Sequence, residues 1–257
     1  MSGEHIFANW ISRVIDAGPR RTQVIRSHET SEGAKTQTFT GEPLQQTIKR
    51  VCKICNEGWM AELESEAKPV MKPMLLDEQP VVLDALEQEL LARWAIKTAL
   101  VMSKAMINPG PGFPPTVEQY HWFYEHRRPL PGSVVWIGRS DGRENWPAYV
   151  DLKVIEFKRE LPDGTEELRR DTLSVAIAIA HLVFIVVVAE LDSQPIFGGG
   201  PGNKRVHVWP TGGLPARWPP PQSFGSSAEL RETTLQMPGG PVPHVFGRDD
   251  PHPATSR

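Results

Sequence analysis

The residues best suited to chemistry stand in two short segments near the amino terminus. The first is Glu4-His5, an acid and a histidine side by side, followed by the apolar pair Ile6-Phe7. The second is the cysteine pair Cys52-Lys53-Ile54-Cys55, followed directly by Asn56, and it contains the only two cysteines of the chain. An imidazole exchanges protons near neutral pH, and thiolates, carboxylates and amide oxygens bind metals. The two segments together indicate a metal-dependent site.

The cysteine pair taken by itself has three interpretations. Two thiolates on one tight turn form half of a tetrahedral zinc site, which usually has a second such pair, and this chain has none. A Cys-x-x-Cys segment that opens a helix is also typical of thioredoxin-like redox sites, although no βαβ pattern precedes it. The third interpretation is two inert, small apolar side chains. A structural disulfide is not expected across so short a spacing.

These residues need local elements that bring them together. Apolar residues at helical spacing predict a short helix over Asn9–Ile15, ended by Gly18-Pro19. A second helix is expected from Glu57, because apolar residues recur three or four apart there. Pro69 and Pro73 should end or kink this helix. Short strands are predicted at Thr22–Arg26, Lys35–Thr40 and Ile48–Val51.

Beyond residue 70 a helical section is expected to about residue 130, and strands follow it. Capping-box pairs, Asp84 with Glu87 and Thr116 with Gln119, predict two helices. The first should end at Asn108-Pro109-Gly110 and the second near Arg127. A hairpin turn is predicted at Pro162-Asp163-Gly164. Strands are expected at Ser133–Arg139, at Tyr149–Arg159, after Arg170 and, as an edge strand, at Lys204–Trp209. The segment after Pro210 is rich in Pro, Gly and Ser and should be disordered.

One apolar run, Leu173–Ala189, approaches the length of a membrane helix. Its first half alternates large and small residues, however, and its second half is rich in β-branched residues. Both features favour a buried strand pair interrupted near His181. We therefore expect no membrane contact.

The overall charge restricts where nucleic acid could bind. The formal net charge is -3, so the molecule is not a polycation and a nucleic-acid surface must be local. Basic residues outnumber acids around the two segments (Arg13, Arg20, Arg21, Arg26, Lys49, Arg50 and Lys53), although such runs are commonly solvated surface. The first residues lack the basic and apolar regions of a secretory signal, so we expect a cytoplasmic location.

The order of these motifs resembles the HNH endonuclease superfamily. Glu4-His5-Ile6-Phe7, the strand into Val51-Cys52-Lys53-Ile54-Cys55-Asn56, and Gly58-Trp59-Met60 with a Glu-rich helix are similar to bacterial and phage members with the pattern EHIF…VCxxCNxGWMxxLE. The resemblance covers roughly residues 3 to 71. It implies a treble-clef-like ββα-metal finger, in which a hairpin carries the acid–histidine pair and a helix carries a further metal ligand.

The resemblance also implies roles for particular residues. His5 matches the general base that activates water, and Glu4 the neighbouring carboxylate ligand. Asn56 matches the helix residue that completes a catalytic Mg²⁺ or Mn²⁺ site. Thr47 stands at the catalytic position where the family has its middle asparagine. Cys52 and Cys55 match one half of a structural Zn²⁺ site.

The chain departs from the family pattern at three places. The family's first cysteine pair, which precedes the acid–histidine pair, has no counterpart here. Thr47 replaces an asparagine, and a threonine cannot orient a histidine as an amide does. Ala8 stands where a proline often follows the histidine motif.

The sequence thus predicts a metal-dependent endonuclease that acts on double-stranded DNA. The alternative is a catalytically degenerate module of the same origin that binds nucleic acid or a partner. The expected fold class is α+β. Its parts are an HNH-like finger at 1–70, a helical section at 71–130, a mostly antiparallel β-rich domain at 131–210 and a disordered tail at 211–257.

Overall fold

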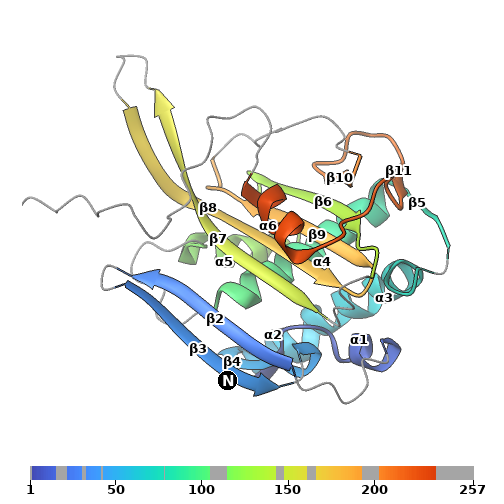
Figure 1. Cartoon of the computed structure of the whole chain (residues 1–257), viewed down its shortest axis with the longest axis horizontal. Coiled ribbons are helices and arrows are strands. Elements are labelled where there is room, and N and C mark those ends of the chain that lie inside the picture. The colour runs from blue at the N-terminus through green and yellow to red at the C-terminus, as the bar shows by residue number, and fades with distance from the viewer. Residues whose placement is uncertain are drawn as a thin grey trace, which may run out of the picture.

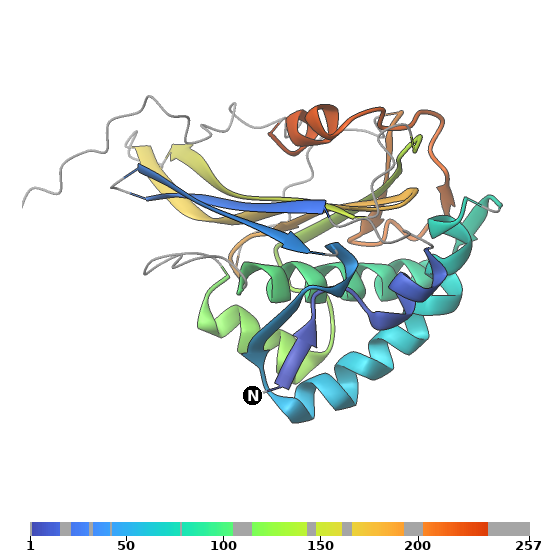
Figure 2. The ribbon, with the colours of Figure 1, turned by 60° about the horizontal axis from the view of Figure 1, so that its bottom comes forward.

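The described parts of the chain form an α+β fold around one antiparallel sheet. The computed structural model describes residues 2–15, 22–30, 33–41, 43–77, 79–104, 115–142, 148–160, 166–192 and 203–235. Helices α3, α4 and α5 lie on one side of the sheet, together with the amino-terminal strands β1 and β4, and α6 lies on the other side (Figures 1 and 2). The predicted α+β class is confirmed.

The main sheet has five antiparallel strands in the order β10-β6-β9-β8-β7. Strand β6 has the bounds that the sequence predicts, and β10 is the expected edge strand. The strands are β6 (Ser133–Arg139), β7 (Tyr149–Glu160), β8 (Glu166–Ile179), β9 (Leu182–Val188) and β10 (Arg205–Trp209). The predicted turn at Pro162-Asp163-Gly164 lies outside the described residues, and Glu160 and Glu166 pair on either side of it.

The apolar run is a strand pair, as predicted, because β8 and β9 meet at the turn formed by Ala180 and His181. Its alternation of large and small residues follows from the two faces of the sheet. Val175 and Ile177 join the cluster under the helices, and Ala176 and Ala178 join a second cluster with residues of the carboxy-terminal segment. Among the described residues, no helix is both long and apolar enough to span a bilayer.

Three helices cover one face of the sheet: α3 (Ala61–Leu75), α4 (Ala85–Ser103) and α5 (Val117–His126). Both predicted capping boxes are present. Asp84 accepts from the Glu87 N–H at 2.8 Å and the Glu87 carboxylate accepts from the Asp84 N–H at 3.0 Å; Thr116 and Gln119 make the same pair of bonds at the start of α5. The predicted stop at Asn108-Pro109-Gly110 lies outside the described residues.

Helix α3 does not end at either proline, which was one of the two expected outcomes; it continues through Pro69 and Pro73 to Leu75. Neither proline belongs to the buried face of the helix, which is formed by Leu63, Ala67, Met71, Met74 and Leu75. On the outer side, water can hydrogen-bond the carbonyl groups that the prolines leave without an N–H donor. The apolar face therefore holds the helix together across both.

The amino-terminal part combines short strands and helical turns. Strand β4 and helix α1 match the predicted segments closely, whereas β2 and β3 are longer than expected and pair with each other. The expected stop at Gly18-Pro19 lies outside the described residues. The elements are β1 (Ser2–His5), α1 (Asn9–Val14), β2 (Thr22–Thr30), β3 (Gly33–Gly41), η1 (Pro43–Gln45), β4 (Thr47–Val51), α2 (Lys53–Cys55) and η2 (Asn56–Met60).

The disorder expected from residue 211 must be corrected for residues 211–235. Strand β11 (Ala216–Trp218) pairs with β5 (Val81–Leu83), and α6 (Ser227–Leu235) follows. Trp218, Phe224 and Leu230 are almost completely buried, and burying such side chains contributes a few kcal/mol each. The prediction of disorder was based on the Pro- and Gly-rich composition, which does not show that these three side chains are buried. Residues 236–257 lie outside the described residues.

One hydrophobic cluster runs through the amino-terminal segment, the helices and the sheet. It includes Ile6 and Ile48 of the amino-terminal strands, Trp94 of α4 and Phe184 of β9. Trp94 and Phe184 contact each other with ring centroids 5.3 Å apart. The boundary expected at residue 70 lies inside α3, so the segments on its two sides share both a helix and a core.

Candidate functional site

The structure brings His5 and Thr47 together at the end of a two-stranded sheet. Strand β1 pairs antiparallel with β4, with His5 opposite Thr47 and Glu4 opposite Ile48. Residues directly opposite in an antiparallel pair lie on the same face, with Cβ atoms about 4.5–5.5 Å apart. Ile6 follows at once and donates its N–H to the Gln46 carbonyl at 2.9 Å. The two positions that the family resemblance marks as catalytic are therefore neighbours, although 42 positions separate them in sequence.

His5 is half-buried, and its Nδ1 atom is shielded from solvent without a hydrogen-bond partner within the described ranges. Ile6 and Phe7, which follow it, are buried and fix the end of β1 against the core. Thr47 is exposed. Buried polar atoms nearly always have a partner, so Nδ1 marks a place where an acceptor is missing. A general base needs such an acceptor to fix its ring orientation.

Glu4 lies on the same strand, with its register opposite Ile48. Neighbouring strand residues point to opposite faces, so Glu4 and His5 can approach one phosphate only where the strand bends or ends. Strand β1 ends at His5, and its register shifts between Ser2 and Glu4. The backbone therefore offers the required irregularity at this place.

The cysteine pair forms the turn between β4 and the following helix. Cys52 is the N-cap of α2, and its Sγ accepts the Cys55 N–H at 3.0 Å. The two sulfurs are joined in a disulfide, with Cα atoms 5.3 Å apart. This corrects the expectation that so short a spacing disfavours a disulfide: the turn at the helix start places the Cα atoms within the usual range of 4.4–6.8 Å. Ile54, between the cysteines, is 84% exposed.

Asn56 lies directly after the cysteine turn, at the start of η2, and is half-buried. The regular helical conformation is interrupted at Gly58, where φ is -99° and ψ is -117°. Helix α3 begins afresh at Ala61. Asn56 is thus carried by a separate helical segment between the thiols and the long helix.

The metal ligands implied by the resemblance are Glu4 and Asn56 for the catalytic ion and the two cysteines for zinc. Within the part of the chain that the structure describes, no three His, Cys, Asp or Glu side chains gather as a metal site requires. A structural zinc does not fit the two sulfurs in the form seen here, because zinc needs free thiolates and two more ligands. A Mg²⁺ ion is less demanding, since it keeps several waters and needs one or two carboxylates. Glu4 and Asn56, the oxygen ligands that the resemblance implies, remain its candidates.

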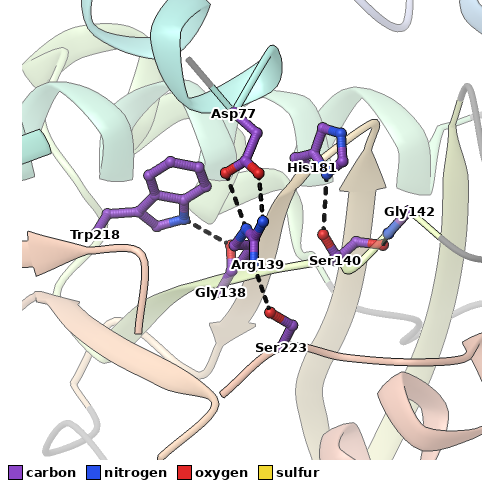
Figure 3. Close-up of polar contacts among 8 residues, drawn as sticks. All are labelled: Asp77, Gly138, Arg139, Ser140, Gly142, His181, Trp218 and Ser223. Atoms are coloured by element: carbon purple, nitrogen blue, oxygen red, sulfur yellow. Dashed lines mark hydrogen bonds and ion pairs between the residues drawn. The ribbon is translucent and has the colours of Figure 1, made fainter. Parts of the chain in front are cut away.

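A second polar cluster connects α3, the sheet and the carboxy-terminal segment (Figure 3). The Asp77 carboxylate accepts from both Nε, at 2.9 Å, and Nη2 of Arg139, and Arg139 Nη1 bonds Ser223 Oγ at 3.2 Å. The hydrogen bonds that Arg139 donates to the Asp77 carboxylate raise the pKa of Arg139. Nearby, Trp218 Nε1 donates to the Gly138 carbonyl at 3.0 Å. These groups satisfy one another, so the cluster fastens three segments rather than forming a ligand site.

His181 belongs to the same region and contacts the Ser140 carbonyl through Nδ1 at 3.1 Å (Figure 3). Ser140 Oγ in turn accepts the Gly142 N–H at 3.3 Å. The sequence assigns no role to His181. Because His181 and Ser140 are 41 positions apart in sequence, no local pattern marks this contact.

Comparisons with protein-family models, with curated proteins and with solved structures find no match for the chain.

Proposed function

We propose that residues 3–71 form an HNH-like finger and that the protein is a metal-dependent endonuclease acting on double-stranded DNA. The observation that carries this proposal is the register of β1 with β4, which sets His5 opposite Thr47. The cysteine turn and Asn56 follow β4 at once, in the order strand, turn and helix. A two-stranded sheet bearing the histidine and a helix bearing the asparagine are the parts that the resemblance implies.

In this proposal His5 takes the proton of the attacking water. A phosphodiester repels nucleophiles through its charge, so cleavage needs a base and a cation together. Glu4 and Asn56 would hold Mg²⁺ or Mn²⁺, which supplies charge neutralisation at the phosphate. The burial of Ile6 and Phe7 fixes the backbone that carries the base.

A plasmid-nicking assay with Mg²⁺ or Mn²⁺ tests the proposal. The native protein should convert supercoiled plasmid to the nicked form, and His5→Ala should abolish this. His121→Ala is a matched control, because His121 is an exposed histidine on α5, and it should retain native activity. Equal nicking by the native protein and His5→Ala would remove His5 from the mechanism.

The missing acceptor at His5 suggests a sharper test of the same site. An asparagine has a longer side chain than threonine and carries an amide oxygen that can accept a hydrogen bond. Because residue 47 is opposite His5, Thr47→Asn should supply the acceptor for Nδ1 and increase the nicking rate. Thr47→Val, which has the same shape without a hydroxyl, should give no increase. A Thr47→Asn rate at or below the native rate would contradict the orienting role of this position.

The second candidate function is a degenerate finger that binds nucleic acid without cleaving it. Two observations favour it: the absence of a three-ligand group within the described residues and the disulfide between the cysteines. It predicts salt-sensitive DNA binding with no nicking by the native protein. Reduction with a thiol reagent before the assay separates the two candidates, since only the endonuclease can gain activity when the thiolates are freed.

A further inference from the structure

Next to the finger, the guanidinium of Arg127 lies between two aromatic rings. Its Cζ is 4.1 Å from the ring centroid of Trp59 and 4.2 Å from that of Tyr124. Trp59 belongs to η2, three positions after Asn56, whereas Tyr124 belongs to α5. The guanidinium therefore connects the finger with the neighbouring helix, and the two rings hold its plane in place.

The backbone also fixes Arg127. It is the C-cap of α5 in the left-handed conformation, with φ 53° and ψ 27°, and its N–H donates to the Phe123 carbonyl at 3.1 Å. Phe123 in turn packs edge-on against Trp59, with ring centroids 5.7 Å apart. The position and direction of the side chain are thus determined before any ligand arrives, which lowers the entropy lost on binding.

Two donors in this group have no acceptor within the described residues. Arg127 Nη1 and Trp59 Nε1 are both buried, and neither makes a hydrogen bond within the described residues. In the same part of the chain, no carboxylate lies within ion-pair distance of Arg127, whereas its neighbour Arg128 pairs with Glu89 at 3.4 Å. An unpaired buried donor costs free energy, more so when it is charged. Arg127 as a whole is only partly buried, so its unbalanced charge can bind an anion at the surface.

We propose that Arg127, held by Trp59 and Tyr124, binds a backbone phosphate of double-stranded DNA. This inference rests on the proposed nuclease function, and it names the contact that positions the duplex beside the finger. Lys49 on β4 and Lys53 on the cysteine turn are exposed cations on the neighbouring elements. A phosphate contact fixes the orientation of the duplex without selecting a sequence.

Fluorescence anisotropy with a labelled 20-base-pair duplex, in EDTA so that no cleavage occurs, tests the inference. Arg127→Met keeps an unbranched stem between the rings and removes the charge. Each phosphate contact adds about 0.9 to the slope of log affinity against log salt concentration, which corresponds to about an eightfold change in affinity at 0.1 M salt. We expect Arg127→Met to bind about eightfold more weakly at 0.1 M salt, with a correspondingly shallower slope.

Arg128→Met is the matched control, because Arg128 is the next residue, 66% exposed and already paired with Glu89. It should bind DNA as the native protein does. Arg127→Lys keeps the charge but loses the planar stacking; it should retain the native salt slope with weaker affinity. This variant replaces Arg127→Met if circular dichroism shows that the latter is unfolded.

The outcomes separate this inference from the proposed function. Native binding by Arg127→Met, or an equal loss in Arg127→Met and Arg128→Met, overturns the role of Arg127 and leaves the nuclease proposal standing. A protein that makes several phosphate contacts loses about 10³–10⁵ in affinity between 50 and 200 mM salt. If the native protein binds no duplex anywhere in this range of salt concentration, both proposals fail together.

Discussion

A buried ion pair joins the helix that extends from the finger to the central helix of the fold. Lys97 of α4 is 1% exposed, and its Nζ lies 2.7 Å from Glu64 Oε1 of α3, whose side chain is 19% exposed. The Lys97 ammonium also lies 5.8 Å from the centroid of the Trp94 ring. We predict that Glu64→Gln destabilises the protein much more than Lys97→Met, although the first substitution changes fewer atoms.

The asymmetry follows from which charge is left behind. Glu64→Gln leaves an ammonium buried without a counter-ion, and breaking such a pair costs about 3–5 kcal/mol. Removing the proton from a lysine at pH 7 costs about 4.6 kcal/mol, which sets a ceiling on this loss. Lys97→Met instead leaves a carboxylate that is partly accessible to water, and it adds an apolar side chain to the core. Its cost should be about 1 kcal/mol or less.

Urea unfolding at pH 7, followed by tryptophan fluorescence, gives the free energy of unfolding of each variant and of the double variant. The double variant should recover most of the loss caused by Glu64→Gln, as a double-mutant cycle requires of coupled residues. Arg93 and Glu66 are a matched pair between the same helices, 3.9 Å apart and far more exposed. Glu66→Gln should cost about 0.5 kcal/mol or less. If Glu64→Gln cost no more than Glu66→Gln, the reasoning would be refuted.

Three further predictions concern other parts of the fold. Burial raises the pKa of Tyr120 to about 12, so the stability that depends on its neutral form is complete below pH 10 and is lost as the pH rises to 12. Between pH 10 and 12, urea unfolding should show a smaller loss of unfolding free energy for Tyr120→Phe than for the native protein, by up to about 2.7 kcal/mol. Gly138→Ala would place a Cβ 2.7 Å from Phe224 Cε2 and should cost about 1–3 kcal/mol, whereas Gly212→Ala, with open space around it, should leave the thermal midpoint unchanged. EDTA should abolish nicking without lowering the thermal midpoint, because the finger shares the common hydrophobic core.

The elements that the sequence predicted best are those fixed by local interactions. A capping box needs only two side chains three positions apart, so Asp84 with Glu87 and Thr116 with Gln119 could be recognised directly. Strand β6 is equally clear, because its β-branched residues stand between turn residues. In these cases the hydrogen bonds and the pattern belong to the same few residues.

The elements that the sequence missed depend on distant partners. Strand β11 exists because Ala216–Trp218 pairs with Val81–Leu83, and nothing in its own three residues distinguishes it from a Pro-rich loop. Helix α3 continues past Pro69 because its apolar side is held by the core. Local propensity was outweighed by tertiary packing in both places.

The candidate site shows the same division. The acid–histidine pair and the cysteine turn are short local motifs, so they could be recognised from the sequence. The pairing of His5 with Thr47 depends on a register between strands far apart in sequence, which only the family resemblance anticipated. Arg127 had no signal of its own, because Trp59 and Tyr124 reach it from different helices.

The family's missing cysteine pair weighs less against the nuclease proposal than the sequence suggests. A small finger generally needs zinc because it cannot bury enough apolar surface to fold alone. Here Ile6, Phe7 and Ile11 are buried in the same cluster as α4 and the sheet, so the hydrophobic core can hold β1 where a second knuckle would. The demand on the site then shifts from a zinc ligand to the hydrogen bond that orients His5, and residue 47 is the position placed to supply it.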